Sequence, residues 1–237
     1  MTAAHHAADP LRFAGLTCKR LFYPCAGEDW APVLDYFVAE VDHFIFADLH
    51  YQFDRIRPMD VPGLRLLPER TWLDGQAYAT LERPSAYGRR GPRQIDPARL
   101  EETYLHEASG RLIRVTRRRG FAQYALKEIP NGSLGVFFHR GDSMGEGGSD
   151  AWFLANRPRR HPPLSNLFAR LKQKLAYPAL IASDGSNTTF EPIVTAVRSD
   201  AQQPVQFELE GLHWARVGTM TDEGRRRTAI WRVMPLY

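Results

Sequence analysis

The sequence has only two cysteines, Cys18 and Cys25, and it has no long apolar run. Two cysteines are too few for a disulfide framework, and no cysteine or histidine cluster stands near them at the spacing of a zinc site. No segment reaches the length needed to span a bilayer, and the first residues lack the basic start and apolar core of a secretion signal. We therefore expect a cytoplasmic protein without a bound metal and without a membrane partner.

Lysine is also scarce, because almost all of the 31 basic residues are arginines, and the formal net charge is only +4. The arginines gather in clusters at residues 89–90, 117–119, 157–160 and 225–227. Such clusters can contact phosphates. The modest charge and the absence of one shared helix face favour solvated loops instead. Nucleic acid is therefore an alternative partner that the sequence does not favour.

The length of 237 residues and the hydrophobic content of 43% are sufficient for one full-sized core, so we expect a single domain over residues 1–237. Residues 19–23, 30–41 and 43–47 predict a strand, a helix and a second strand. Asp29 is the expected N-cap of the helix, and Pro32 is tolerated in a first turn. Residues from about 50 to 100 are rich in proline and arginine and predict an irregular insertion.

The remainder alternates short apolar runs with turn residues. The expected elements are a strand pair at 103–106 and 111–116, a helix at 121–129, a strand at 133–139, a helix at 164–175, a strand at 179–182, and antiparallel strands at 205–209, 212–217 and 228–233. This order predicts an α/β, Rossmann-like fold, with a mostly parallel sheet, helices on both faces and a C-terminal antiparallel hairpin.

Three acids, Asp48, Asp142 and Asp184, each follow a predicted parallel strand. Ligands of open α/β sheets bind outside the carboxyl ends of such strands. Aspartate is also a common turn residue after any strand, and for each acid taken singly this explanation is the stronger one. The coincidence of all three favours a binding site at this edge of the sheet.

The segment after the 133–139 strand is dense in glycine and polar residues. Glycine leaves the backbone unrestrained, which suits a loop that closes over a ligand. A surface turn whose acids cap the following segment is the alternative. The candidate catalytic residues are Asp142 and Glu146, and the candidate substrate-binding residues are Ser143, Gly145, Gly147, Gly148, Ser149 and Asp184.

The turn after the first strand contains a single glycine, Gly27, and therefore lacks the G-x-G-x-x-G fingerprint. A pyrophosphate placed here would meet Glu28 and Asp29, so an uncharged or cationic nucleoside suits this turn better. Asp48 follows about twenty residues on, where an acid commonly accepts hydrogen bonds from ribose hydroxyls. The candidate cofactor-binding residues are Tyr23, Pro24, Gly27, Asp29 and Asp48.

This order of glycine turn, strand-end acids and terminal hairpin resembles class I S-adenosylmethionine-dependent methyltransferases. The resemblance implies a seven-stranded sheet whose last strand is inserted antiparallel. It also implies S-adenosylmethionine between Tyr23, Gly27 and Asp48, and a substrate near Asp142. The first turn departs from the family, because it has Pro24 and one glycine where several glycines are usual.

The sequence thus predicts a protein that binds a nucleoside-type small molecule, with methyl transfer to an unknown substrate as the candidate activity. The alternative is a non-catalytic Rossmann-like protein that acts through protein binding or weak nucleic-acid binding.

Overall fold

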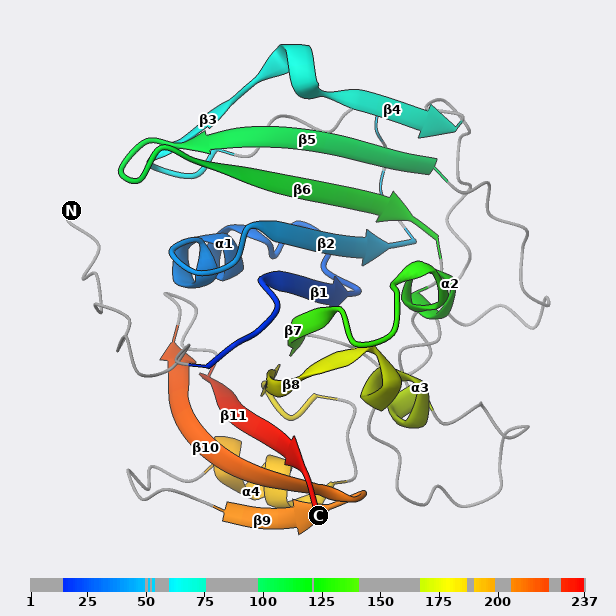
Figure 1. The fold of residues 1–237 in the computed structure, drawn as a ribbon, viewed down its shortest axis with the longest axis vertical. Helices are drawn as coiled ribbons and strands as arrows, with labels where there is room; N and C mark the ends of the chain where they lie inside the picture. The colour runs from blue at the N-terminus through cyan, green and yellow to red at the C-terminus, as the bar shows by residue number, and fades with distance from the viewer. Residues whose placement is uncertain are drawn as a thin grey trace.

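The computed structural model describes residues 15–49, 51, 53, 60–75, 98–120, 122–140, 167–186, 190–198, 206–221 and 227–236. These residues form one mixed sheet of eleven strands, with short helices packed against it (Figure 1). The strands are β1 (Arg20–Pro24), β2 (His43–Asp48), β3 (Leu64–Leu66), β4 (Trp72–Gly75), β5 (Ala98–His106), β6 (Arg111–Arg119), β7 (Leu134–His139), β8 (Leu175–Ser183), β9 (Gln206–Leu209), β10 (Leu212–Thr221) and β11 (Arg227–Pro235). The helices are α1 (Ala31–Phe37), α2 (Ala122–Glu128), α3 (Leu167–Lys174) and α4 (Glu191–Arg198), and η2 (Pro68–Arg70) is a 3-10 turn.

The centre of the sheet is a parallel block in the order β6-β2-β1-β7-β8. The chain passes from β1 through α1 to β2 on one side, and β7 later pairs with β1 on the other side. The strand order therefore reverses beside β1. In Figure 1 the arrowheads of β1, β2 and β6 point to the same side of the molecule, so their carboxyl ends form one edge. Such a reversal is where ligands bind in open α/β sheets.

Both flanks of this block are antiparallel. The hairpin of β5 and β6 turns at Gly110, whose φ of +69° lies in the left-handed region that favours glycine. Strands β3 and β4 extend the sheet beyond β5, so part of the expected irregular insertion is regular strand. On the opposite flank β11 lies antiparallel between β8 and β10, and β9 is the outer strand.

The predicted Rossmann-like fold is therefore wrong. Parallel pairing is confined to the five central strands, and the described helices are only seven or eight residues long. The protein is mostly strand, because residues 98–119 and 206–235 carry the alternating pattern of antiparallel hairpins and contribute long paired strands. Sequence inspection treated most of these strands as additions to a helix-flanked core, whereas they make up much of the sheet.

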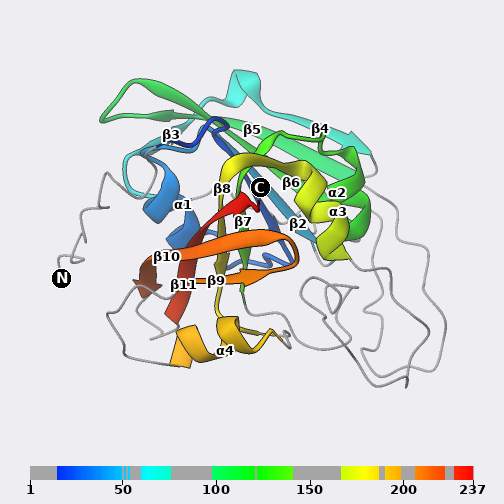
Figure 2. The ribbon, with the colours of Figure 1, turned by 60° about the horizontal axis from the view of Figure 1, so that its bottom comes forward.

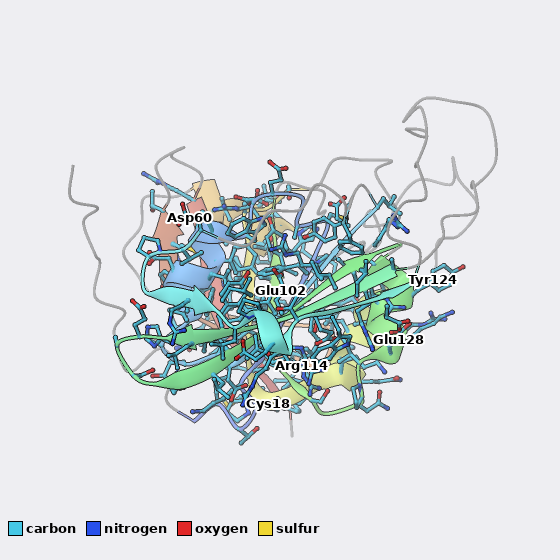
Figure 3. The ribbon with its side chains drawn as sticks, turned by 90° about the horizontal axis from the view of Figure 1, so that it is seen from above. Cys18, Asp60, Glu102, Arg114, Tyr124 and Glu128 are labelled. Atoms are coloured by element: carbon cyan, nitrogen blue, oxygen red, sulfur yellow. The ribbon has the colours of Figure 1, made fainter. Side chains whose placement is uncertain are left out.

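Two hydrophobic cores lie on the two faces of the sheet. Helix α1 buries Val33, Leu34 and Phe37 in the core that also contains Tyr23 and Phe46. The other core contains buried side chains from α2, α3 and α4, together with two tryptophans of the antiparallel flank; its main members are Leu126, Phe168, Ile193, Trp214 and Trp231. Figures 2 and 3 show α1 apart from α2 and α3, and Figure 3 places Glu102 and Arg114 on opposite sides of the sheet. No helix in the described part of the chain is long and apolar enough to span a membrane.

The turn between β1 and α1 also differs from its prediction at one residue. The N-cap of α1 is Trp30, which makes no side-chain capping bond, and Pro32 lies in the first turn as expected. Asp29 precedes the cap, and its carboxylate has other partners. Cys25 and Gly27 have φ values of +55° and +50°. This left-handed backbone carries the chain from the sheet edge toward α1.

Candidate functional site

The carboxyl ends of β1 and β2 are joined by a bond between backbone and side chain. The Gly27 N–H donates to Asp48 Oδ2 at 2.9 Å, and the Ala26 N–H donates to the Ala47 carbonyl oxygen at 3.2 Å. An ideal Cβ on Gly27 would stand 3.9 Å from the same Asp48 oxygen, on a backbone that L side chains rarely adopt. Gly27, Asp48 and Cys25 are all partly exposed, so a ligand can reach this corner of the edge.

The neighbouring gap between β1 and β7 is closed by an ion pair. Arg140, which follows β7 and is fully buried, donates from Nε to Asp29 Oδ2 at 2.8 Å, and its NH2 group also contacts Asp29 Oδ1. The Tyr23 hydroxyl donates to Asp29 Oδ2 at 2.9 Å. Burial, followed by the Asp29 charge, raises the pKa of Tyr23, so this hydroxyl keeps its proton. The strand order reverses beside β1. Because these contacts fill the gap between β1 and β7, the accessible part of this edge is the corner between β1 and β2.

A second buried ion pair stands behind this corner on the adjoining strands. Arg117 of β6 lies 2.9 Å from Glu102 of β5 between Nε and Oε2, and both side chains are less than 5% exposed. The Tyr104 hydroxyl donates to Glu102 Oε1 at 3.0 Å, and the Arg117 guanidinium lies 5.8 Å from the centre of the Trp30 ring. Burial raises the pKa of Glu102, and the Arg117 charge opposes that rise. Each of these two charges thus has an opposite charge beside it.

The chain after Asp48 returns over the end of β6. Tyr51 is 6% exposed, and its ring lies against Phe53, with ring centres 6.1 Å apart. Arg119, the last residue of β6, pairs in register with Asp48 and places its guanidinium 5.8 Å from the centre of the Phe53 ring. The rings of Tyr51 and Phe53 and the guanidinium of Arg119 therefore lie at the end of β2 that carries Asp48.

The structure brings together only part of the predicted site. Gly27, Asp29 and Asp48 lie at one edge, as expected from the order of β1 and β2. Tyr23 and Pro24 are buried in the sheet and offer little side-chain surface. Asp184 follows β8, and its Oδ1 accepts a 2.8 Å bond from the Ser186 N–H in a tight turn. Seven predicted residues lie outside the described residues: Asp142, Ser143, Gly145, Glu146, Gly147, Gly148 and Ser149.

Sequence reasoning missed Tyr51, Glu102 and Arg117, and it misread the cluster 117–119 as a solvated loop. All three arginines belong to β6: Arg117 is paired with Glu102, Arg118 is paired with Glu128 of α2, and Arg119 is fully buried. The available signal was alternation, because 117 and 119 continue the buried face of Ile113 and Val115. These arginines serve contacts within the protein rather than an open phosphate-binding surface.

No protein-family model matches the chain, and neither the curated proteins nor the solved structures contain a match. Within the described ranges, no group of three histidine, cysteine or acidic side chains is placed to hold a metal ion. Any function for this edge of the sheet is therefore argued from the geometry above.

Proposed function

We propose that the protein binds a nucleoside-type small molecule at the carboxyl ends of β1 and β2. The observation that carries this proposal is the bond from the Gly27 N–H to the Asp48 carboxylate, which places a partly exposed acid at the point where the strand order reverses. A carboxylate has about four acceptor positions and can accept from the ligand as well as from Gly27. Ribose hydroxyls are donors of the kind that such a strand-end acid accepts.

The charges of this edge favour a nucleoside without phosphates. Arg117 and Arg140 each face an acid of the protein, Glu102 and Asp29 respectively. Both guanidinium groups are buried, so recruiting either one to a phosphate would break an ion pair and leave an acid unpaired. The exposed Glu28 and the partly exposed Asp48 would repel a pyrophosphate.

S-adenosylmethionine is the nucleoside that the resemblance to methyltransferases proposes, and its sulfonium charge suits an acidic corner. Methyl transfer would also need a substrate site, and the residues predicted for it lie largely outside the described part of the chain. We therefore propose ligand binding at Asp48 as the primary function, with S-adenosylmethionine as one ligand to be tested.

The test is thermal unfolding with adenosine, S-adenosylmethionine or S-adenosylhomocysteine at millimolar concentration. A ligand that binds only the folded state at 100 times its Kd adds about 2.7 kcal/mol of stability, and the melting temperature rises accordingly. Asp48→Asn keeps the shape and removes the charge, so it should abolish most of this rise. Asp74→Asn is the matched control, because Asp74 lies on β4, away from the parallel block, with a side chain 73% exposed.

The control should respond to ligand as the wild type does. An unchanged melting temperature of the wild type with all three compounds would refute the proposal. An equal rise in wild type and Asp48→Asn would show that the ligand binds elsewhere.

A further inference from the structure

The hydroxyl group of Tyr51 is buried and makes no hydrogen bond within the described part of the chain. A buried hydroxyl without a partner costs about 1 to 3 kcal/mol relative to a bonded one. The other tyrosine hydroxyls of this region illustrate the usual arrangement, since Tyr23 donates to Asp29 and Tyr104 donates to Glu102. Within the described residues, the Tyr51 hydroxyl thus differs from those of Tyr23 and Tyr104, because it donates no hydrogen bond.

Tyr51 belongs to the proposed site by its packing: its ring lies against Phe53, the Arg119 guanidinium lies over the Phe53 ring, and Arg119 pairs in register with Asp48. Burial raises the pKa of Tyr51 most, followed by the Asp48 charge, and the Arg117 charge lowers it. Cys25 and Glu102 raise it further. Cys25 follows β1, and the other three residues belong to β2, β5 and β6, so the hydroxyl stands near the carboxyl ends of β1 and β2, beside the Asp48 carboxylate. It remains protonated at neutral pH and is available as a donor.

Several of the nearby groups of the protein contact one another. Glu102 accepts from Tyr104 and faces Arg117, and the Gly27 N–H is directed at Asp48. The Tyr51 ring is held by its contact with Phe53. Within the described ranges the Tyr51 hydroxyl has no acceptor, and an oxygen of a bound ligand can supply one.

We propose that the Tyr51 hydroxyl donates a hydrogen bond to an oxygen of the bound ligand and so selects ribose over deoxyribose. This inference rests on the proposed function. A ribose hydroxyl both donates and accepts. One hydroxyl of the sugar can donate to Asp48 while it, or its neighbour, accepts from Tyr51, and a deoxyribose lacks one of these groups. Tyr51 is then a specificity-determining residue of the Asp48 site.

The experiment compares Tyr51→Phe with Tyr177→Phe. Tyr177 is the matched control because its hydroxyl already donates to the Lys172 carbonyl oxygen at 3.0 Å, in the contact between α3 and β8. Binding of adenosine, 2′-deoxyadenosine and 3′-deoxyadenosine is measured by calorimetry, and the melting temperature of each unliganded protein is measured in parallel.

We expect Tyr51→Phe to weaken adenosine binding about tenfold, which is the effect of one lost hydrogen bond. One of the two deoxyadenosines should bind the wild type correspondingly less well than adenosine, and Tyr51→Phe should no longer distinguish that pair of compounds. The unliganded Tyr51→Phe protein should melt no lower than the wild type, because no protein bond is removed. Tyr177→Phe should melt lower and bind adenosine as the wild type does.

Three other outcomes would overturn part or all of this inference. If the wild type binds adenosine and Tyr51→Phe binds it equally well, the role of Tyr51 is refuted and the Asp48 site stands. If unliganded Tyr51→Phe melts lower than the wild type by as much as Tyr177→Phe does, the hydroxyl is bonded within the protein and the inference fails. If the wild type binds none of the nucleosides, the proposed function fails, and the role of Tyr51 fails with it.

Discussion

His43, the first residue of β2, is held as a neutral imidazole. Arg20 Nε donates to His43 Nδ1 at 3.2 Å, so the proton is on Nε2, which lies 2.8 Å from Thr116 Oγ1. The Thr116 hydroxyl in turn donates to Glu101 at 3.0 Å. Burial, and then the charges of Arg114 and Arg20, lower the pKa of His43 to about 3.

This shift predicts a loss of stability in acid. Between about pH 6.5, the pKa of an unfolded histidine, and pH 3, the unfolded chain binds a proton at His43 that the folded protein does not bind. The free energy of unfolding should therefore fall as the pH falls, by up to about 1.4 kcal/mol per pH unit from this residue alone. Above pH 6.5 the residue should contribute no pH dependence.

The measurement is urea unfolding at several pH values between 4 and 8 for the wild type and His43→Gln. Glutamine can accept from Arg20 and donate to Thr116 but does not titrate. At high pH we expect the wild type to have the larger free energy of unfolding. This difference between the two proteins should shrink or reverse as the pH falls, because only the wild type loses stability at this position. A difference that is independent of pH would show that His43 titrates normally in the fold.

At the scale of elements, β6 joins the antiparallel flank to the parallel block, and Arg117 is one of its two buried arginines. Arg117→Met should cost about 3 to 5 kcal/mol, because it leaves Glu102 buried without its cation. The double variant Arg117→Met with Glu102→Leu should recover much of this loss, since apolar residues often replace a buried ion pair at little cost. Arg118→Ser should cost about 1 kcal/mol or less, because its partner Glu128 is 51% exposed.

These variants are compared by urea unfolding. A double variant no more stable than Arg117→Met would indicate that the pair is needed for more than mutual neutralisation, for instance through the bond from Tyr104 to Glu102. A small effect of Arg117→Met would contradict the buried position of its side chain.

Most individual elements could be predicted from the sequence. The strands β1, β2 and β7 were placed within one or two residues, because a continuous apolar run between turn residues marks a strand buried on both faces. Helix α4 was missed, and α1 ends at Phe37 rather than near residue 41. The fold class was predicted wrongly because strand pairing depends on partners distant in sequence, which local periodicity does not reveal.

The contact between Gly27 and Asp48 could also be predicted from the sequence. Asp48 and Gly27 meet because the ends of adjacent parallel strands meet, and this follows from the order of the elements alone. Arg140 and Tyr51 could not be assigned, because Arg140 contacts Asp29 across β1 and β7, and Tyr51 lies beside β2, β5 and β6, whose mutual pairing the sequence did not predict.

At the scale of the whole molecule, the eleven strands form a continuous hydrogen-bonded sheet, although two separate cores lie on its faces. Because the inner strands contribute side chains to both cores, neither core can unfold without exposing the back of the other. We expect a single cooperative unfolding transition.

The measurement follows thermal unfolding by circular dichroism and by tryptophan fluorescence. Circular dichroism reports on the whole sheet, whereas Trp214 and Trp231 are buried in one core only; the fluorescence is measured on a Trp30→Phe variant, because Trp30 packs against the other core. The two transitions should coincide. A fluorescence transition at a different temperature would show that the two faces unfold independently.

The position of β11 has a consequence for how the chain is synthesised. β11 is the last strand in sequence, yet it lies inside the sheet and is the only described strand that joins β8 to β10. A growing chain on the ribosome can assemble the parallel block first, but its β8 edge stays open, and β9 and β10 have no place in the sheet until β11 has emerged. An open strand edge pairs readily with other chains. The nascent protein is therefore most exposed to aggregation in the interval between the synthesis of β8 and that of β11.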